Sequence, residues 1–188
     1  MKKRVIIVTD GDEVAKKAVE VAAGNIGGRA ISRSAGNPSP LNGQELIGYI
    51  KKSTWDPVIV MVDDCGDLGN GEGEKIIREI YEHPDLDLLG VVAVASNTVE
   101  EEGVRVDRSV TRQGTITERA VDKHGDEKHD KVVRGDTVSI LSELKIPVII
   151  GLGDPGKMDF SDRPEDGAPL TTRALQEIIN QNGRSRLN

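Results

Sequence analysis

The stretch VIIVTDGD, residues 5–12, decides the fold of this chain. Its β-branched run at 5–8 is typical of a strand whose two faces are both buried, as in parallel sheets covered by helices. Aspartate and glycine then end the run and turn the chain. Apolar side chains recur at helical spacing over 13–23, and Gly24-Asn25 stops that helix. The sequence thus opens with a strand, a loop and a helix, the repeating unit of α/β proteins.

The same alternation of apolar runs and helical patterns recurs along the chain. An aliphatic core is expected, because only 2% of the residues are aromatic. We therefore expect an α/β fold with an open, mostly parallel sheet in a Rossmann-like or Toprim-like three-layer sandwich. The further strands are expected at residues 29–34, 58–62, 88–95 and 147–151, and the further helices at 43–55, 74–83, 135–144 and 171–179.

Residues 100–134 interrupt this alternation. Polar and apolar residues alternate around Gln113-Gly114, which predicts a β-hairpin insertion. The charged stretch 122–130 is expected to be mobile or exposed at an edge. A length of 188 residues suits a single α/β domain over residues 1–188, with a frayed tail at about 183–188.

Composition excludes several classes of protein. A net charge of −7 argues against an unaided nucleic-acid binder, because phosphate contacts require clustered Lys and Arg. No apolar stretch has the length of a transmembrane segment, and the run at 5–8 is too short for a signal peptide. A single cysteine, Cys65, rules out an intrachain disulfide. We expect a soluble protein that reaches a membrane only through a partner.

Acidic residues follow three of the expected strands, at 10–12, 63–66 and 153–157. Open α/β sheets bind ligands beyond the carboxyl ends of their strands. Converging carboxylates repel one another unless protons, bases or a cation intervene, and Mg²⁺ and Ca²⁺ prefer oxygen ligands. The alternative is that each aspartate caps a helix or shapes a turn. The residues predicted as metal ligands, for Mg²⁺ or Ca²⁺, are Asp10, Asp12, Asp63 and Asp64.

Two further segments supply candidate ligand-binding residues. Ser96, Asn97 and Thr98 end the strand at 88–95 and offer hydroxyl and amide groups to a small polar ligand. Residues 151–158, GLGDPGKM, nearly fit the phosphate-binding pattern G-x-x-x-x-G-K-[ST], but methionine replaces the hydroxyl that holds Mg²⁺. We expect a tight turn in which Asp154 and Lys157 contact the ligand, and no nucleotide hydrolase of that type.

No complete catalytic set is evident, and no catalytic residue is predicted. The Asp10-x-Asp12 step after a buried strand resembles the Mg²⁺-binding Toprim domain, but the glutamate that Toprim carries on an earlier strand is missing. Asp63 or Asp64 would have to replace it. Cys65 follows a strand, as some nucleophiles do, but a small buried thiol is the more common role for such a cysteine. His124 and His129 lie in the charged stretch without a third strong metal ligand.

Short segments over nearly the whole chain resemble the soluble stage V sporulation protein AE family, of the AEa type, from spore-forming Firmicutes. The segments are VTDGD (8–12), SAGNP (34–38), MVDDCG (61–66), GEGE (71–74), VASNT (94–98), GDTV (135–138) and GDPGKM (153–158). The resemblance implies a component of the SpoVA system, which moves dipicolinic acid, usually as its calcium chelate, into the forming spore and out of it during germination.

The resemblance also implies a location and partners. The protein would be peripheral at the spore inner membrane, beside membrane-embedded SpoVA proteins, with dipicolinic acid as a candidate ligand. The leading hypothesis is thus a non-enzymatic accessory protein of spore germination. The alternative is a Mg²⁺-dependent Toprim-like enzyme or binder that acts on a phosphate or a nucleotide. A third hypothesis, a module that binds calcium dipicolinate, uses the same acidic loops.

Overall fold

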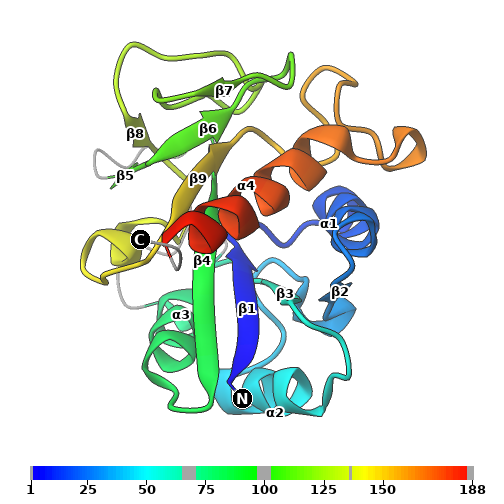
Figure 1. The fold of residues 1–188 in the computed structure, drawn as a ribbon, viewed down its shortest axis with the longest axis vertical. Coiled ribbons are helices and arrows are strands. Elements are labelled where there is room, and N and C mark those ends of the chain that lie inside the picture. Colours follow the sequence, from blue (N-terminus) through cyan, green and yellow to red (C-terminus); the bar gives the residue numbers. More distant parts are fainter. Residues whose placement is uncertain (1, 65–70, 97–102, 136, 186–188) are drawn as a thin grey trace.

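A seven-stranded sheet forms the centre of the described chain in this computed structural model, which describes residues 2–64, 71–96, 103–135 and 137–185 (Figure 1). The strand order is β2-β3-β1-β4-β9-β6-β7, and every neighbouring pair is parallel except β6 and β7. This arrangement confirms the open, mostly parallel sheet. The strands are β1 (Lys3–Val8), β2 (Arg29–Ala30), β3 (Val58–Met61), β4 (Leu86–Val94), β6 (Arg108–Val110), β7 (Ile116–Thr117) and β9 (Ile149–Leu152).

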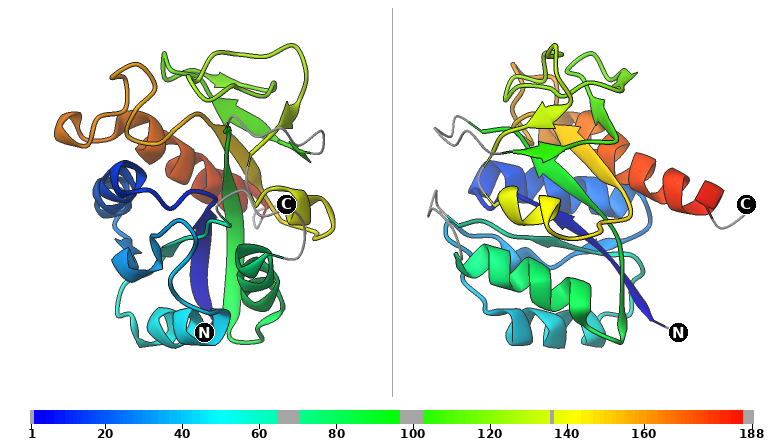
Figure 2. Two further views of the ribbon diagram at one scale, coloured as in Figure 1. Left: turned by 180° about the vertical axis from the view of Figure 1, so that it is seen from behind. Right: turned by 90° about the vertical axis from the view of Figure 1, so that its left-hand side faces the viewer.

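Helices cover both faces of the sheet and complete the expected three layers. They are α1 (Glu13–Asn25), α2 (Gly43–Lys52), α3 (Glu72–Glu82) and α4 (Pro169–Ser185). The helices α1 and α4 lie side by side on one face, and α2 and α3 lie on the other (Figure 2). In β1, Ile6 and Val8 pack toward α1 and α4, whereas Val5 and Ile7 pack toward α2 and α3. Both faces of β1 are therefore buried, which explains its unbroken apolar run.

Side-chain hydrogen bonds fix where α2 and α4 begin. Asn42 and Glu45 form a capping box at the start of α2, with hydrogen bonds of 2.9 and 3.1 Å. Thr171 or Thr172 was expected to cap α4, but both lie inside the helix. Buried Asp162 accepts hydrogen bonds from the N–H groups of Leu170 and Thr171 at 2.8 and 2.9 Å, so the helix begins at Pro169. It extends to Ser185.

Two expected elements are shorter than their sequence patterns suggest. The strand expected at 29–34 ends at Ala30, and Ser32–Ser34 form a 3₁₀ helix. The Ser34 hydroxyl accepts the Met61 N–H at 2.8 Å and takes the place of a backbone pairing partner. The helix expected at 135–144 is reduced to a 3₁₀ turn, Ser139–Ser142, because Thr137 has a positive φ of 61° that no α-helix accommodates.

The insertion contains the expected hairpin, because β6 and β7 pair in antiparallel fashion and extend the sheet beyond β9. A separate antiparallel pair joins β5 (Val104–Arg105) to β8 (Val132–Val133). The charged stretch 122–130 was expected to be mobile or exposed at an edge; its His124, Glu127 and His129 are exposed, and the stretch folds back on itself. The Ala120 N–H donates to the Asp130 carbonyl at 2.9 Å, and the Lys128 N–H donates to the Ala120 carbonyl at 2.8 Å.

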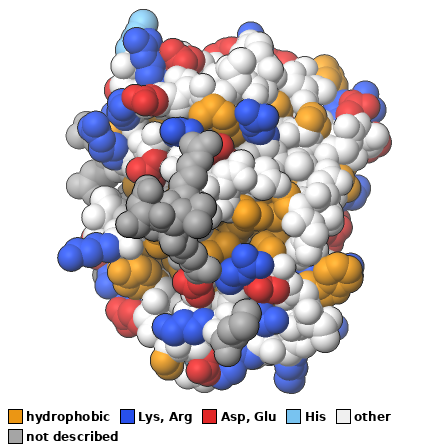
Figure 3. Space-filling view, in the orientation of Figure 1, with side chains coloured by type: hydrophobic (Ala, Val, Ile, Leu, Met, Phe, Trp, Pro, Cys, Tyr) orange, Lys and Arg blue, Asp and Glu red, His pale blue; other side chains and the backbone are white. Residues whose placement is uncertain are grey.

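Charged side chains of both signs are interspersed on the face shown in Figure 3, and apolar side chains lie between them. Among the described residues on this face, no extended patch of one charge is seen. Such mixing agrees with the composition, in which 25 basic residues accompany 32 acidic ones.

A candidate ligand-binding pocket at the strand ends

The chain leaves the neighbouring strands β1 and β4 in opposite directions, toward β2 and β3 on one side and toward β9 on the other. Such a reversal opens a crevice at the carboxyl ends of the two strands. Thr9 marks the point of separation. Its N–H donates to the Val92 carbonyl at 3.1 Å, and its hydroxyl accepts the Val94 N–H at 3.0 Å. The Thr9 side chain therefore continues the strand pairing while the backbone of β1 turns away.

A pocket of about 230 Å³ lies in this crevice. Residues at the end of β4 or in the segments after β1, β2, β3, β4 and β9 line it, together with one residue of the insertion. The lining residues are Thr9, Asp10, Asp12, Asn37, Asp63, Val94, Ala95, Ser96, Lys123, Asp154 and Lys157. The pocket thus combines four carboxylates with two ammonium groups.

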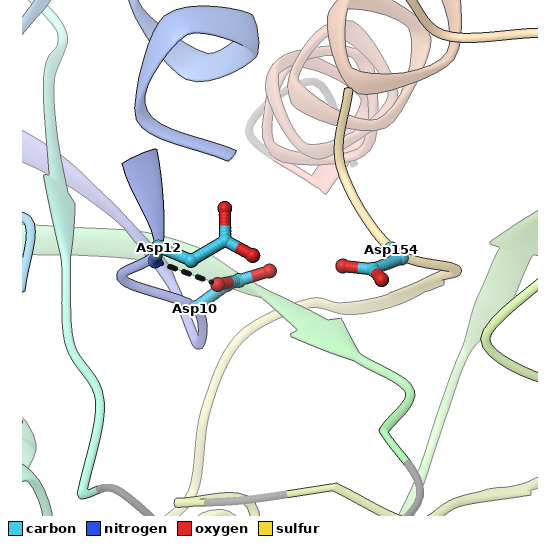
Figure 4. A group of neighbouring side chains, drawn as sticks. All are labelled: Asp10, Asp12 and Asp154. Atoms are coloured by element: carbon cyan, nitrogen blue, oxygen red, sulfur yellow. Dashed lines mark hydrogen bonds between the residues drawn. The ribbon is translucent and has the colours of Figure 1, made fainter. Parts of the chain in front are cut away.

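Three of the carboxylates face one another: Asp10 and Asp12 from the loop after β1, and Asp154 from the loop after β9 (Figure 4). One ligand oxygen of each lies within 4.8 Å of the others. Ca²⁺–O bonds of about 2.3–2.6 Å allow ligands on opposite sides of one ion to lie about 5 Å apart, whereas Mg²⁺, at about 2.1 Å, requires about 4.2 Å or less. Because all three oxygens lie within 4.8 Å of one another, they are close enough to share one such cation.

Asp12 has two roles, one structural and one in the pocket. Its Oδ1 accepts the N–H groups of Val14 and Ala15, both at 2.8 Å, and caps α1. Its Oδ2 accepts Lys157 Nζ at 2.5 Å, and the same ammonium lies 3.2 Å from both oxygens of Asp154. Lys157 thus bridges two of the three carboxylates. A metal ion that used all three would have to displace it.

The charges in this cluster shift the pKa values of its members. Burial alone would raise the pKa of Asp12, but hydrogen bonds from Lys157, Ala15 and Val14 and the charge of Lys157 lower it overall. Burial likewise opposes the charge of Lys157, yet its contacts with Asp12 and Asp154 raise its pKa overall. The pair is therefore ionised at neutral pH.

Asp10 behaves differently, because its burial outweighs the hydrogen bond that it accepts. The pKa of Asp10 is raised from its ordinary value of 3.8 to about 7. Burial is the largest cause, the charges of Asp12, Asp154 and Asp63 add to it, and a hydrogen bond from the Asp12 N–H acts against it. Asp10 therefore holds a proton through the acid range, and a cation bound beside it would replace that proton.

The structure separates the two aspartates that follow β3. Asp63 lines the pocket, and the Ser39 hydroxyl accepts its N–H at 2.9 Å. Asp64 is directed instead to the start of α3, where its carboxylate accepts the Gly73 N–H. Burial raises the pKa of Asp64. Of the four predicted metal ligands, the structure brings Asp10, Asp12 and Asp63 to one pocket and places Asp64 outside it.

Three of the five predicted ligand-binding residues lie in the part of the chain that the structure describes. Ser96, Asp154 and Lys157 line the pocket. Asn97, Thr98 and Cys65 lie outside the described residues. The segment after Lys157 forms turns, with a 3₁₀ helix at Pro164–Asp166, and α4 begins only at Pro169. The near-phosphate loop therefore lacks the helix that a phosphate-binding loop requires, as expected.

Sequence reasoning missed Lys123, which the insertion brings to the pocket. The Lys123 carbonyl accepts the Asp154 N–H at 2.8 Å and ties the insertion to the loop after β9. The turn that presents Lys123 has a recognisable pattern. The Asp122 carboxylate accepts the N–H groups of His124 and Asp126 at 2.9 and 3.0 Å, and Gly125 has a φ of 79°. The pattern predicts a turn but not its contact with Asp154.

Comparison with known proteins identifies the family. No helix among the described residues combines the length and the apolar character that a bilayer span requires. Comparisons with curated proteins and with solved structures found no match. The family model SpoVAE, described as stage V sporulation protein AE1, matches residues 4–182. The chain therefore belongs to the stage V sporulation protein AE1 family, and this membership gives it a role in sporulation and the SpoVA system.

Proposed function

We propose that this protein is an accessory component of the SpoVA system, peripheral to the spore inner membrane. It acts in the movement of dipicolinic acid by binding other SpoVA proteins and, at the strand-end pocket, calcium dipicolinate. The observation that supports the ligand is the cluster of Asp10, Asp12 and Asp154 in a crevice between strand ends. The family supports the system in which the protein works.

The coordination chemistry of calcium fits this pocket. Ca²⁺ takes about six to eight oxygen or similar ligands, and one dipicolinate supplies three of them through its ring nitrogen and two carboxylates. The chelated ion therefore retains open positions for protein carboxylates. Asp10 and Asp154 would fill them once Lys157 leaves Asp154, whereas one oxygen of Asp12 stays committed to the cap of α1.

Calorimetry with the purified protein tests ligand binding. We expect Asp10→Asn and Asp154→Asn each to weaken calcium dipicolinate binding about tenfold, the effect of losing one charged ligand worth about 1.4 kcal/mol. Glu82→Gln is the matched control, because Glu82 is exposed at the end of α3, far from the pocket in the sequence and fold. Unchanged affinity in both pocket variants would contradict the proposed ligand.

A test in spores addresses the role in the SpoVA system. Spores that carry Asp154→Asn in place of the wild-type gene should release dipicolinate later after a germinant, and spores that lack the gene should show at least as long a delay. The time course of dipicolinate release is the measurement. Release kinetics unchanged by deletion would contradict the proposed role.

The second candidate is a Mg²⁺-dependent enzyme or binder that acts on a phosphate or nucleotide. Asp63 favours it, because β3 neighbours β1 and Asp63 lines the same pocket as Asp10 and Asp12. It supplies the third acid that the Asp-x-Asp step otherwise lacks. Calorimetric titration with Mg²⁺, Mn²⁺ and Ca²⁺, for wild type and an Asp10→Asn, Asp63→Asn variant, separates the candidates. Mg²⁺ binding that is strengthened by a nucleotide favours the enzyme. An equal heat of binding in wild type and the variant contradicts a metal site at these aspartates.

A further inference from the structure

A second hollow, of about 400 Å³, adjoins the strand-end pocket. We call the strand-end pocket the acidic pocket, after Asp10, Asp12, Asp63 and Asp154 in its lining. The two share Ala95, Ser96 and Lys123 in their linings. Beyond these shared residues, the hollow is lined by the insertion and by Arg134, which follows β8. We call it the basic hollow, defined by Lys123, Lys128 and Arg134.

The balance of charge in the basic hollow is positive. The carboxylate in its lining, Asp122, is engaged by the N–H groups of His124 and Asp126 and shapes the turn. Lys128 and Arg134 lie 3.8 and 3.4 Å from Asp130, contacts of partly exposed groups that are individually weak. Among the described residues, no ion pair involves the Lys123 ammonium. The hollow therefore concentrates cationic groups beside a cluster of carboxylates.

Ser96 lies where the two hollows meet. Its N–H donates to the Arg134 carbonyl at 3.0 Å, which fixes the end of β4 against the segment that carries Arg134. Its hydroxyl oxygen is buried and has no hydrogen-bond partner within the described chain. Buried hydroxyl groups without a partner are uncommon, because their lost hydration is not replaced. An anionic oxygen in the hollow would accept this hydroxyl.

We propose that the basic hollow is an anion subsite for a small molecule with two or more carboxylate or phosphate oxygens. It holds this anion next to a cation in the acidic pocket, so that the protein takes the cation and its counter-anion as a pair. This inference rests on the proposed function for its cation, but the anion subsite stands on the basic side chains and Ser96. Binding of either partner strengthens binding of the other by the same factor.

Calorimetry on the full chain in metal-free buffer tests the subsite. The probes are dipicolinate, isophthalate (the same dicarboxylate without the ring nitrogen) and inorganic phosphate. A Lys128→Gln, Arg134→Gln variant is compared with wild type, and Lys52→Gln at the far end of α2 is the control. We expect wild type to bind dipicolinate and isophthalate without metal, and the double variant to bind both about fivefold more weakly, consistent with two partly exposed charge contacts. Its Ca²⁺ affinity should stay within about twofold of wild type.

The outcomes separate this inference from the proposed function. Equal anion affinity in the double variant and wild type, or no anion binding by wild type, overturns the subsite even if Ca²⁺ binds. Anion binding that is lost in the variant while Ca²⁺ fails to bind supports the subsite and overturns the cation site. Tighter binding of phosphate than of dipicolinate supports the subsite and assigns it to phosphate. If the double variant does not fold by circular dichroism, Lys128→Gln alone replaces it under the same criteria.

Discussion

The acidic pocket and the basic hollow share a wall but differ in how the fold builds them. The loops after β1, β3 and β9 supply the carboxylates of the acidic pocket, so strand order fixes their positions. The insertion and the segment after β8 supply the basic side chains. The loops of the sheet thus supply the negative side chains, and the insertion with the segment after β8 supplies the positive ones. A site for a cation and an anion together needs both parts of the chain.

The two regions also differ in how their charges are balanced. Lys157 neutralises part of the acidic pocket from within, and Asp10 lowers its negative charge further by retaining a proton up to about pH 7. In the basic hollow, the carboxylate of Asp122 is used for the turn, and Lys128 and Arg134 share the partly exposed Asp130, so the three cationic side chains outnumber the acids beside them. We therefore expect the acidic pocket to bind its cation by exchange, and the basic hollow to bind its anion directly.

The largest effect on stability is expected at Gly11, where two backbone segments beside the acidic pocket lie closest together. A Cβ on Gly11 would lie 2.0 Å from the Gly36 carbonyl oxygen, so the loop after β1 would have to move. Gly11→Ala should lower the free energy of unfolding by about 3 kcal/mol, the upper range for overpacking, and abolish Ca²⁺ binding. Urea unfolding measures it. Gly48→Ala, with open space around its Cβ, is the control and should be neutral or stabilising.

Asp10→Asn tests whether Asp10 retains a proton and so reduces the negative charge of the acidic pocket. The folded-state pKa of about 7 lies above the ordinary 3.8, so the folded protein binds more protons between these values and wild-type stability falls as pH rises through this window. Asn has no carboxyl proton to lose, so the stability of the variant does not fall in this way. In metal-free buffer it should be about 1–2 kcal/mol more stable than wild type at pH 8, and nearly equal near pH 4. Urea unfolding at both pH values is the measurement, and a gap that does not widen with pH would refute the assignment.

Lys157→Met tests whether a bound cation has to displace the Lys157 ammonium from the carboxylates. Without the ammonium, Asp12 and Asp154 lose their bridging partner, and an incoming ion has nothing to displace. Ca²⁺ affinity should rise about tenfold, or about 1.4 kcal/mol. The free energy of unfolding without Ca²⁺ should fall by about 1 kcal/mol, since the ion pairs are partly exposed. Lys157→Arg keeps the charge and serves as the control. Weaker Ca²⁺ binding by Lys157→Met would show that Lys157 supports the ion instead of competing with it.

The smallest effect is expected at Lys123, which the two hollows share. Lys123→Gln removes one positive charge near both ligands. Calorimetry should show Ca²⁺ binding strengthened and dipicolinate binding weakened, each by about two- to threefold at low ionic strength. Both changes should shrink in about 0.5 M salt because exposed charges are then screened. A change of the same sign for both ligands would contradict the opposite charges of the two regions.

The sequence was sufficient for the parts of the site that depend on strand ends. Asp10 and Asp12 directly follow a β-branched run, and the alternation of elements predicted a parallel sheet that gathers such loops at one edge. It did not separate Asp63 from Asp64. Neighbouring residues in an extended chain point to opposite sides, so one of them faces the pocket and the other the start of α3.

Long-range contacts account for what the sequence left open. Asp154 was predicted to contact a ligand but was not among the predicted metal ligands, because its position next to Asp10 and Asp12 depends on β9 lying beside β4. Lys123 reaches the pocket through the hydrogen bond between its carbonyl and the Asp154 N–H, which has no sequence pattern. The shortened strand at 29–34 has a similar cause, since the Ser34 hydroxyl takes a pairing position next to Met61.

A crystal structure of the protein with calcium dipicolinate tests the central claim most directly. The account predicts Ca²⁺ within about 2.6 Å of carboxylate oxygens of Asp10 and Asp154. It also predicts Lys157 displaced from Asp12, and the dicarboxylate extended into the basic hollow toward Lys123 and Lys128. An ion bound elsewhere, or a ligand outside both hollows with the contact between Lys157 and Asp12 intact, would contradict it.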